Sequence, residues 1–406
     1  MRINALIVLL LTGLVAATFG FGIYLFAQLV PDMRDSLGFD ISCVGTITAA
    51  GQFGFLLCAL LAAWITPRVG GGWVIFVSGV VCAAALLLIP LTHDIVLIGM
   101  LLTVLAGTAA TVFVPMVDVI SRTVAFNYRG MAMGLVSSGT SYGVFVNSLL
   151  VPLYAAQGQW PMVWWIVGLI TVVLAIGVAV VFKRAGLFLQ PEAATISEPM
   201  PKVDKAALMQ PWVLTVWAMN FLLGFSTFPF QNYLSSYLRT ELNFAVTYTA
   251  QIWASIGFVG MFAGLAVGWL ADRVGLRIAM MLVYACVALA AMILVTHPGG
   301  YWPMVAGVLF ALAFYPIFGL IPAYVSKMAG SAAMAVTLFG VANILQGVGG
   351  MLGNFSGAVL ARFSGSFVGV YVAIALVAVS LAGLTLRLPK EAGAMQVANP
   401  LATVST

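Results

Sequence analysis

Charged residues are scarce in this chain of 406 residues. Asp, Glu, Lys and Arg together make up 7% of it, against roughly 25% in an ordinary soluble domain. Hydrophobic residues make up 63%, which is more apolar surface than the core of a single soluble domain can bury. A soluble globular protein is therefore excluded, and the apolar surface must face lipid.

Histidine and cysteine are scarce as well. The two histidines, His93 and His297, lie at the ends of apolar runs and lack the i+4 partner that a metal site requires. The four cysteines have no C-x-x-C spacing and fall within or beside apolar runs, as small packing residues do. We therefore expect no metal, no cofactor and no disulfide.

Long apolar runs are abundant. About 20 mostly apolar residues span the hydrocarbon core as a helix, whereas the strands of an outer-membrane barrel would alternate in polarity. The sequence predicts an all-α membrane protein with twelve transmembrane helices, at roughly 4–30, 41–66, 72–91, 95–122, 131–156, 161–183, 211–238, 245–271, 277–296, 301–326, 332–360 and 365–387. Glycines inside these runs, such as Gly347-x-Gly349-Gly350-x-x-Gly353, favour close helix packing, because a nucleotide-binding loop would need a preceding strand.

A short segment occurs twice. Trp64-Ile65-Thr66-Pro67-Arg68-Val69-Gly70 returns as Trp269-Leu270-Ala271-Asp272-Arg273-Val274-Gly275, each copy closing a long apolar run. The repeat predicts two pseudo-symmetric halves of six helices each. We expect an N-terminal bundle at 1–183, a linker at 184–210, a C-terminal bundle at 211–387 and a tail at 388–406.

Basic residues are distributed unequally between the two sides of the predicted helices. Thirteen fall on the side of the termini and the linker, and three, Arg34, Arg239 and Arg362, fall on the other. The positive-inside rule then predicts a multi-pass protein of the cell inner membrane with both termini, the linker and the tail in the cytoplasm. The net charge of +5 is explained by this topology, so no nucleic-acid partner is expected.

The second copy of the repeat carries a known pattern. Gly268-Trp269-Leu270-Ala271-Asp272-Arg273-Val274-Gly275-Leu276-Arg277 is similar to the G-x-L-A-D-R-x-G-x-R signature of the major facilitator superfamily, and Arg129-Gly130-Met131-Ala132-Met133-Gly134 resembles the start of the fifth helix in many members. The resemblance covers residues 4–387. It implies the major facilitator fold, secondary transport by alternating access, and a central cavity lined by spans one, four, seven and ten.

The first copy departs from that signature, since Pro67 replaces the acid and Ala63 the first glycine. In the second copy the resemblance assigns gating to Asp272 and Arg273. In the first half, Asp118, four residues before Arg122, is the candidate to replace the missing acidic charge. Two roles stay open for this pair: a structural latch through the ion pair, or protonation of Asp118 in coupling.

Polar residues within apolar spans mark transport pathways or contacts between helices. The residues expected to face the cavity and bind substrate are Tyr24, Gln28, Thr111, Asn220, Gln231, Asn232 and Tyr315. Second-rank candidates, for which a purely interhelical hydrogen bond is an equal alternative, are Asn147, Gln251, Asn343 and Gln346. Asn354, near the end of the eleventh span, is expected to lie outside the site.

These features predict a secondary active transporter of a small organic solute, coupled to a proton or another ion, acting as a monomer in the bilayer. The segment Pro31-Asp32-Met33-Arg34-x-x-Leu37-Gly38 resembles bacterial members that handle organic anions or small metabolites, but spans eight and eleven lack the basic residue that such members use. An exporter of drugs or metabolites is the alternative within the superfamily. A membrane-embedded receptor or enzyme would need a soluble sensor domain or a buried catalytic set, so we expect no enzyme.

Overall fold

The computed structural model describes residues 2–125, 128–189, 208–329 and 332–390. Within these ranges the chain is helical and contains no strand. The first part comprises α1 (Arg2–Val15), the π-helix η1 (Ala16–Tyr24), α2 (Leu25–Leu37), α3 (Ile41–Val69), α4 (Gly71–Leu88), α5 (Ile95–Phe113), α6 (Met116–Thr123), α7 (Arg129–Ser137), α8 (Gly139–Tyr154) and α9 (Trp160–Arg184). The second comprises α11 (Pro211–Ser236), the π-helix η5 (Tyr237–Glu241), α12 (Val246–Val274), α13 (Leu276–Thr296), α14 (Trp302–Met328), α15 (Ala332–Ser364) and α16 (Val368–Thr385).

The all-α membrane fold predicted from the sequence is confirmed. Eleven helices in the described ranges are long and apolar enough to cross a membrane. The predicted fifth span is not among them because α7 and α8 divide it next to Ser138. The first span is longer than predicted, since α1, η1 and α2 run on past Pro31 to Leu37 and so bring Asp32 into the helix.

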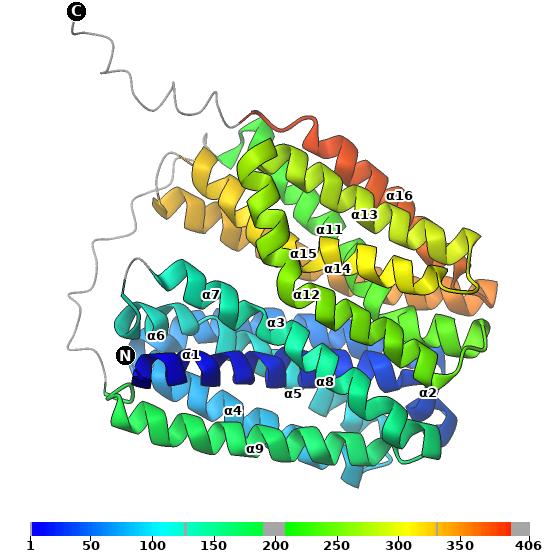
Figure 1. The fold of residues 1–406 in the computed structure, drawn as a ribbon, viewed down its shortest axis with the longest axis horizontal. Coiled ribbons are helices and arrows are strands. Elements are labelled where there is room, and N and C mark those ends of the chain that lie inside the picture. The colour runs from blue at the N-terminus through cyan, green and yellow to red at the C-terminus, as the bar shows by residue number, and fades with distance from the viewer. Residues whose placement is uncertain (1, 126–127, 190–207, 330–331, 391–406) are drawn as a thin grey trace, which may run out of the picture.

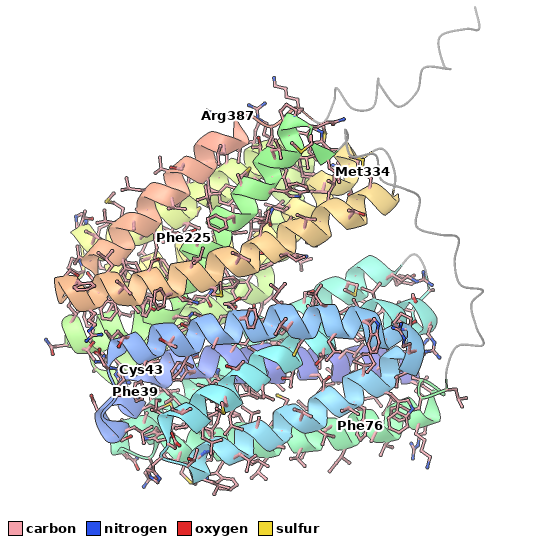
Figure 2. The ribbon with its side chains drawn as sticks, turned by 180° about the vertical axis from the view of Figure 1, so that it is seen from behind. Phe39, Cys43, Phe76, Phe225, Met334 and Arg387 are labelled. Carbon is pink, nitrogen blue, oxygen red and sulfur yellow. The ribbon has the colours of Figure 1, made fainter. Side chains whose placement is uncertain are left out.

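The helices form two groups, which we call the first bundle (α1 to α9) and the second bundle (α11 to α16) (Figure 1). The most extensive contacts between the bundles are those of α3 with α15, α8 with α12, and α2 with α11. We name the two ends of the molecule after the helices found there, the α2 end and the α6 end. The bundles meet at the α2 end, near Phe39 and Cys43, and their helices diverge toward the α6 end (Figure 2).

Glycines produce the closest helix contacts, as the sequence suggested. In α15, a side chain at Gly349 would collide with the carbonyl oxygen of Phe221 in α11, and one at Gly353 with that of Phe225. Gly143 of α8 lies equally close to Gly20 of η1. These backbones approach each other because no side chain separates them.

The repeated segment adopts the same conformation in both bundles. The guanidinium of Arg68 lies 4.0 Å from the ring centre of Trp64, and that of Arg273 lies 3.8 Å from Trp269. Each copy ends at a single glycine with positive φ, 93° at Gly70 and 88° at Gly275, and the next helix starts immediately afterwards. Glycine is favoured here because other residues rarely adopt this conformation.

Residues beside the expected domain limits pack onto the bundles. Leu187 is buried next to Gly72 of α4, and Phe188 stacks near Trp73. At the other limit, Leu388 is buried and the carbonyl of Pro389 accepts a hydrogen bond from Tyr324 of α14. The remainder of the expected linker and tail, 190–207 and 391–406, lies outside the described residues.

Candidate functional site between the bundles

Three of the expected site residues contact other helices, and they are Tyr24 at the end of η1, Gln28 in α2 and Tyr315 in α14. The ring of Tyr24 contacts Phe314 of the second bundle edge to face, with centroids 6.3 Å apart. Gln28, one turn further along, is 2% exposed and its Nε2 lies 3.5 Å from the carbonyl oxygen of Val144. Tyr315 packs over Gly260 of α12, and the same glycine lies against the hydroxyl of Ser141. We call Tyr24, Gln28, Ser141, Phe314 and Tyr315 the central cluster.

The central cluster contains buried polar atoms without a partner. Gln28 Oε1 and Ser141 Oγ are inaccessible, and neither forms a hydrogen bond of good geometry with any described residue, although the Ser141 hydroxyl faces the hydroxyl of Tyr315. Leaving such a group unpaired costs about 1–3 kcal/mol, and an unpaired buried group in a native protein calls for an explanation such as a bound water or ligand. These two atoms therefore keep hydrogen-bonding capacity that the described residues do not use.

A second polar contact lies between α11 and α15. The amide of Asn232 donates to Oδ1 of Asn354 at 2.9 Å, and the hydroxyl of Tyr233 donates to the carbonyl of Asn354. The structure thus ties Asn354, which was expected outside the site, directly to a candidate residue. Asn354 Nδ2 itself is buried and has no partner among the described residues.

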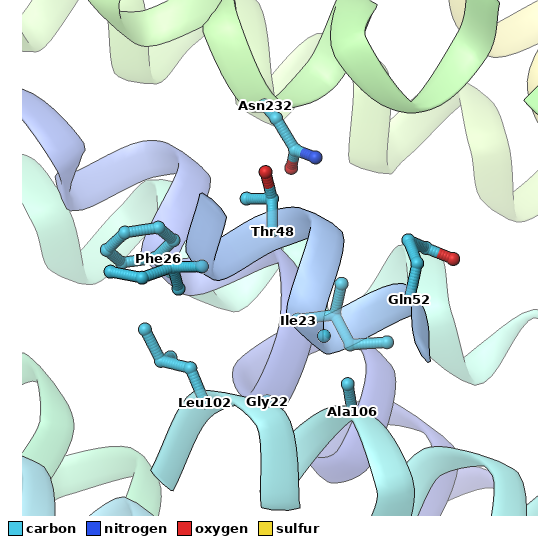
Figure 3. A pocket seen from close by; sticks show the side chains of 10 residues that line it. Gly22, Ile23, Phe26, Thr48, Gln52, Leu102, Ala106 and Asn232 are labelled. Atoms are coloured by element: carbon cyan, nitrogen blue, oxygen red, sulfur yellow. The ribbon is translucent and has the colours of Figure 1, made fainter. Parts of the chain in front are cut away.

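Asn232 also borders a small cavity between the bundles. Its amide points toward Thr48 of α3, with Phe26 and Gln52 at the sides (Figure 3). The cavity measures about 30 Å³, which is room for about two waters. This cavity is therefore too small for an organic solute.

The other expected residues lie in different surroundings. Thr111 accepts a hydrogen bond from Ser78 of α4 inside the first bundle, at 2.7 Å. Asn220 is buried and donates to the carbonyl of Val216 in its own helix. Gln231 and Gln346 are buried, and their Nε2 atoms have no partner in the ranges that the structure describes, whereas Gln251 and Asn343 are exposed.

Asn147 has a clear structural contact. Its amide donates to the carbonyl of Gly20 at 2.7 Å, so it links α8 to the π-helical segment η1. Its Oδ1 is buried and has no hydrogen-bond partner within the described part of the chain. Asn147 thus forms a hydrogen bond between helices, which was the alternative to substrate binding for this residue.

An ion pair between the bundles was not expected from the sequence. The guanidinium of Arg239, in η5, donates twice to the carboxylate of Asp32, in α2, with Nη2 to Oδ1 at 2.6 Å. The two side chains are only 12% and 8% exposed. Two parallel charge-assisted bonds make this the strongest geometry for such a pair, and it lies at the α2 end.

A second ion pair also joins the bundles at the α2 end. Arg362, at the end of α15, lies 3.6 Å from Asp40, which precedes α3. These side chains are 64% and 50% exposed, so water screens their attraction. A hydrogen bond from Ser42, together with the Ile41 amide and the Arg362 charge, lowers the pKa of Asp40.

Comparison with known proteins identifies the family. The model of the Major Facilitator Superfamily matches residues 12–354, which is most of the chain. The chain belongs to the Major Facilitator Superfamily. Solved structures agree in fold: the nucleoside transporter NupG superposes with a TM-score of 0.73 at 15% identity, covering 94% of this chain and 100% of that one.

Other relatives of this superfamily member are more varied. A bacterial homologue of the human lysosomal transporter Spinster, solved inward-facing and occupied, has a TM-score of 0.69 at 13% identity and covers 98% and 97% of the two chains. "Probable anion transporter 6, chloroplastic" of Arabidopsis thaliana is 25% identical over 55% of this chain and 46% of its own. A chloramphenicol resistance protein of Streptomyces lividans is 26% identical over 65% and 67%. The chain spans about half the length of the plant relatives it matches.

The expected gating residues of this superfamily member lie at the α6 end. Asp118 and Arg122 form an i, i+4 ion pair of 3.6 Å in α6, with side chains 32% and 26% exposed, and Arg122 also donates to the carbonyl of Leu189. Asp272 and Arg273 are exposed in the last turn of α12. Neither pair reaches the central cluster, so neither has direct contact with a solute bound there.

Proposed function

We propose that this protein is a secondary active transporter that binds a small organic solute at the central cluster between its bundles. The observation that carries the proposal is the pair of unpaired buried atoms, Gln28 Oε1 and Ser141 Oγ, beside Tyr24 and Tyr315. A solute that enters a site in lipid gives up hydrogen bonds to water, and such atoms replace them.

The chemistry of the cluster favours a solute without strong net charge. Its members are an amide, hydroxyls and aromatic rings, and the nearly buried guanidinium of Arg239 is neutralised by Asp32. Since a buried anion needs a paired cation, we propose an uncharged or zwitterionic substrate that carries hydrogen-bonding groups and an apolar face for Phe314.

We propose alternating access as the mechanism. The bundles contact each other from the α2 end as far as Gly260. Phe318 and Asn343 lie nearer the α6 end and are exposed. The described conformation is then closed at the α2 end and open toward the α6 end. The distribution of basic residues supports a cytoplasmic α6 end, with cytoplasmic termini and linker, in the inner membrane.

The remaining assignments complete the proposal. The protein acts as a monomer without enzymatic activity, and the bundles at 1–183 and 211–387 rock about the central cluster, joined by the linker at 184–210. Its partners are the substrate, a coupling proton and the bilayer. Asp118 serves either as a latch with Arg122 or as the proton-binding group, and its position away from the cluster favours the latch.

Export of an uncharged compound is the second candidate. Two facts favour it: the uncharged aromatic lining of the central cluster, and the similarity to a chloramphenicol resistance protein. The direction of transport separates the two, and counterflow in vesicles of known orientation measures it.

Binding tests the proposed site. Thermal-shift screening of the purified protein with charged and uncharged metabolites identifies a ligand, because saturation at 100 times the dissociation constant stabilises by about 2.7 kcal/mol. Gln28→Ala and Ser141→Ala should then weaken binding of that ligand roughly five- to hundredfold each. Asn343→Ala, which removes an exposed amide, is the matched control. Unchanged affinity in both cluster variants would place the site elsewhere.

A further inference from the structure

An apolar groove runs along the second bundle, apart from the central cluster. Its volume is about 530 Å³, within the usual range for ligand sites. Trp269 and Leu282 on its walls are 57% and 42% exposed, although they belong to membrane-spanning helices. The lining includes Ala266, Trp269 and Leu270 of α12, Leu282 and Cys286 of α13, and Leu312 of α14.

The groove forms because three helices separate unevenly. A single residue, Gly275, joins α12 to α13 at the α6 end, and both helices pack much more extensively on α14 than on each other. Ala266 is too small to fill the space between them. Because the lining side chains are apolar, the groove suits a hydrocarbon chain and offers a polar solute no partner.

A cation stands at the mouth of the groove. Ala266, Trp269 and Arg273 occupy one face of α12, at i, i+3 and i+7. Arg273 stacks on the Trp269 ring at 3.8 Å, and among the described residues it forms no ion pair or hydrogen bond. Stacking fixes the guanidinium plane while leaving its N–H edge available, and that edge matches the geometry of a phosphate. In the last turn of a membrane helix, it lies at the level of lipid headgroups.

We propose that this groove binds one anionic glycerophospholipid, with an acyl chain between α12 and α13 and the phosphate on Arg273. The first bundle provides an internal comparison. Arg68 stacks on Trp64 in the same manner but donates to the Trp64 carbonyl, and the position that corresponds to Ala266 is Leu61. The lipid site is therefore specific to the second bundle, and it is independent of the transported solute.

Two substitutions remove the two halves of the site. Arg273→Gln removes the cation, while Ala266→Leu fills the groove with the side chain found in the first bundle. Arg68→Gln is the matched control, since it removes the equivalent stacked cation. Native mass spectrometry of the full chain would count retained phosphatidylglycerol, with phosphatidylcholine as the zwitterionic probe, and thermal shift would measure stabilisation by each lipid.

The wild type and Arg68→Gln should retain one phosphatidylglycerol molecule and melt at a higher temperature with it than with phosphatidylcholine. Arg273→Gln should abolish this preference, and Ala266→Leu should reduce retention of both lipids. Equal retention of the two lipids by the wild type would overturn the proposal, as would undiminished phosphatidylglycerol binding in both second-bundle variants.

Discussion

The two best-defined carboxylate–guanidinium pairs of the molecule lie at opposite ends and differ in almost every respect. At the α2 end, Asp32 and Arg239 are 207 positions apart, belong to different bundles and are nearly buried. At the α6 end, Asp118 and Arg122 are four positions apart in one short helix and about a third and a quarter exposed. The first pair holds two rigid bodies together, whereas the second stabilises only its own helix.

Under the proposed alternating access, in which one end opens at a time, this difference has a consequence. Opening the α2 end must separate Asp32 from Arg239, so the pair contributes to the equilibrium between the two states. Opening or closing the α6 end leaves Asp118 and Arg122 at the same separation. A ligand or substitution changes a conformational equilibrium only through interactions that differ between the states.

The largest effect is expected from Asp32→Asn. It leaves the Arg239 charge nearly buried without a partner, and breaking such a pair costs about 3 kcal/mol or more. The α2 end should open more often, so a cysteine placed at Thr48 should react faster with a membrane-impermeant maleimide added from that side. The double variant Asp32→Asn with Arg239→Gln should recover part of the closed population. Slow labelling in the single variant would show that the pair does not hold the end closed.

A somewhat smaller effect is expected from Asn354→Leu. It removes the acceptor of the Asn232 amide inside the second bundle, which costs about 1–3 kcal/mol. Because both residues belong to one bundle, the loss should appear as a lower unfolding temperature without faster labelling at Thr48. Asn232→Leu combined with it should cost less than the sum of the single variants. Strictly additive losses would mean that the two amides do not interact.

Asp118→Asn should have a small effect on stability, below about 1 kcal/mol, because the pair is partly exposed and local. Uphill transport in proteoliposomes decides its role. If Asp118 is a structural latch, the Asp118→Asn variant should still accumulate substrate against its gradient. Failure of accumulation with intact downhill exchange would instead identify Asp118 as the coupling group.

The smallest effect is expected from Asp40→Asn, which acts on the exposed pair with Arg362. Since the pKa of Asp40 is lowered in the folded protein, its contribution is complete above the unfolded value of about 3.9 and is lost as the pH falls through the lower folded value. The unfolding temperature of the wild type should therefore decline slightly more than that of the variant below about pH 4. If the unfolding temperatures of the wild type and the variant fell in parallel with pH, the Asp40 carboxylate would contribute nothing to stability.

Local patterns in the sequence were sufficient for the fold but not for the contacts between bundles. Apolar runs predict helices because lipid leaves the backbone few alternatives, and the repeat at Trp64 and Trp269 predicted two loops that indeed share one geometry. Arg239 was assigned only to one side of the membrane and Asp32 only to a segment after the first span, since nothing local links residues so far apart. Ser141 was missed because a lone serine in a helix is usually bonded to its own backbone.

The candidate site shows the same division. Tyr24 and Gln28 could be grouped because they lie one turn apart, whereas their proximity to Tyr315 depends on Gly260, whose missing side chain lets the tyrosine approach Ser141. Thr111 shares a helical face with Asp118, yet it contacts Ser78. Periodicity identifies a face of a helix, but tertiary packing determines what that face meets.

The one-residue connections at Gly70 and Gly275 also have a mechanical consequence. A single residue spans at most about 3.6 Å, so the end of α3 cannot move away from the start of α4, nor the end of α12 from the start of α13. If one helix of such a pair tilts, the joined end of its neighbour must move with it. Each connection therefore couples the motions of two helices at the α6 end.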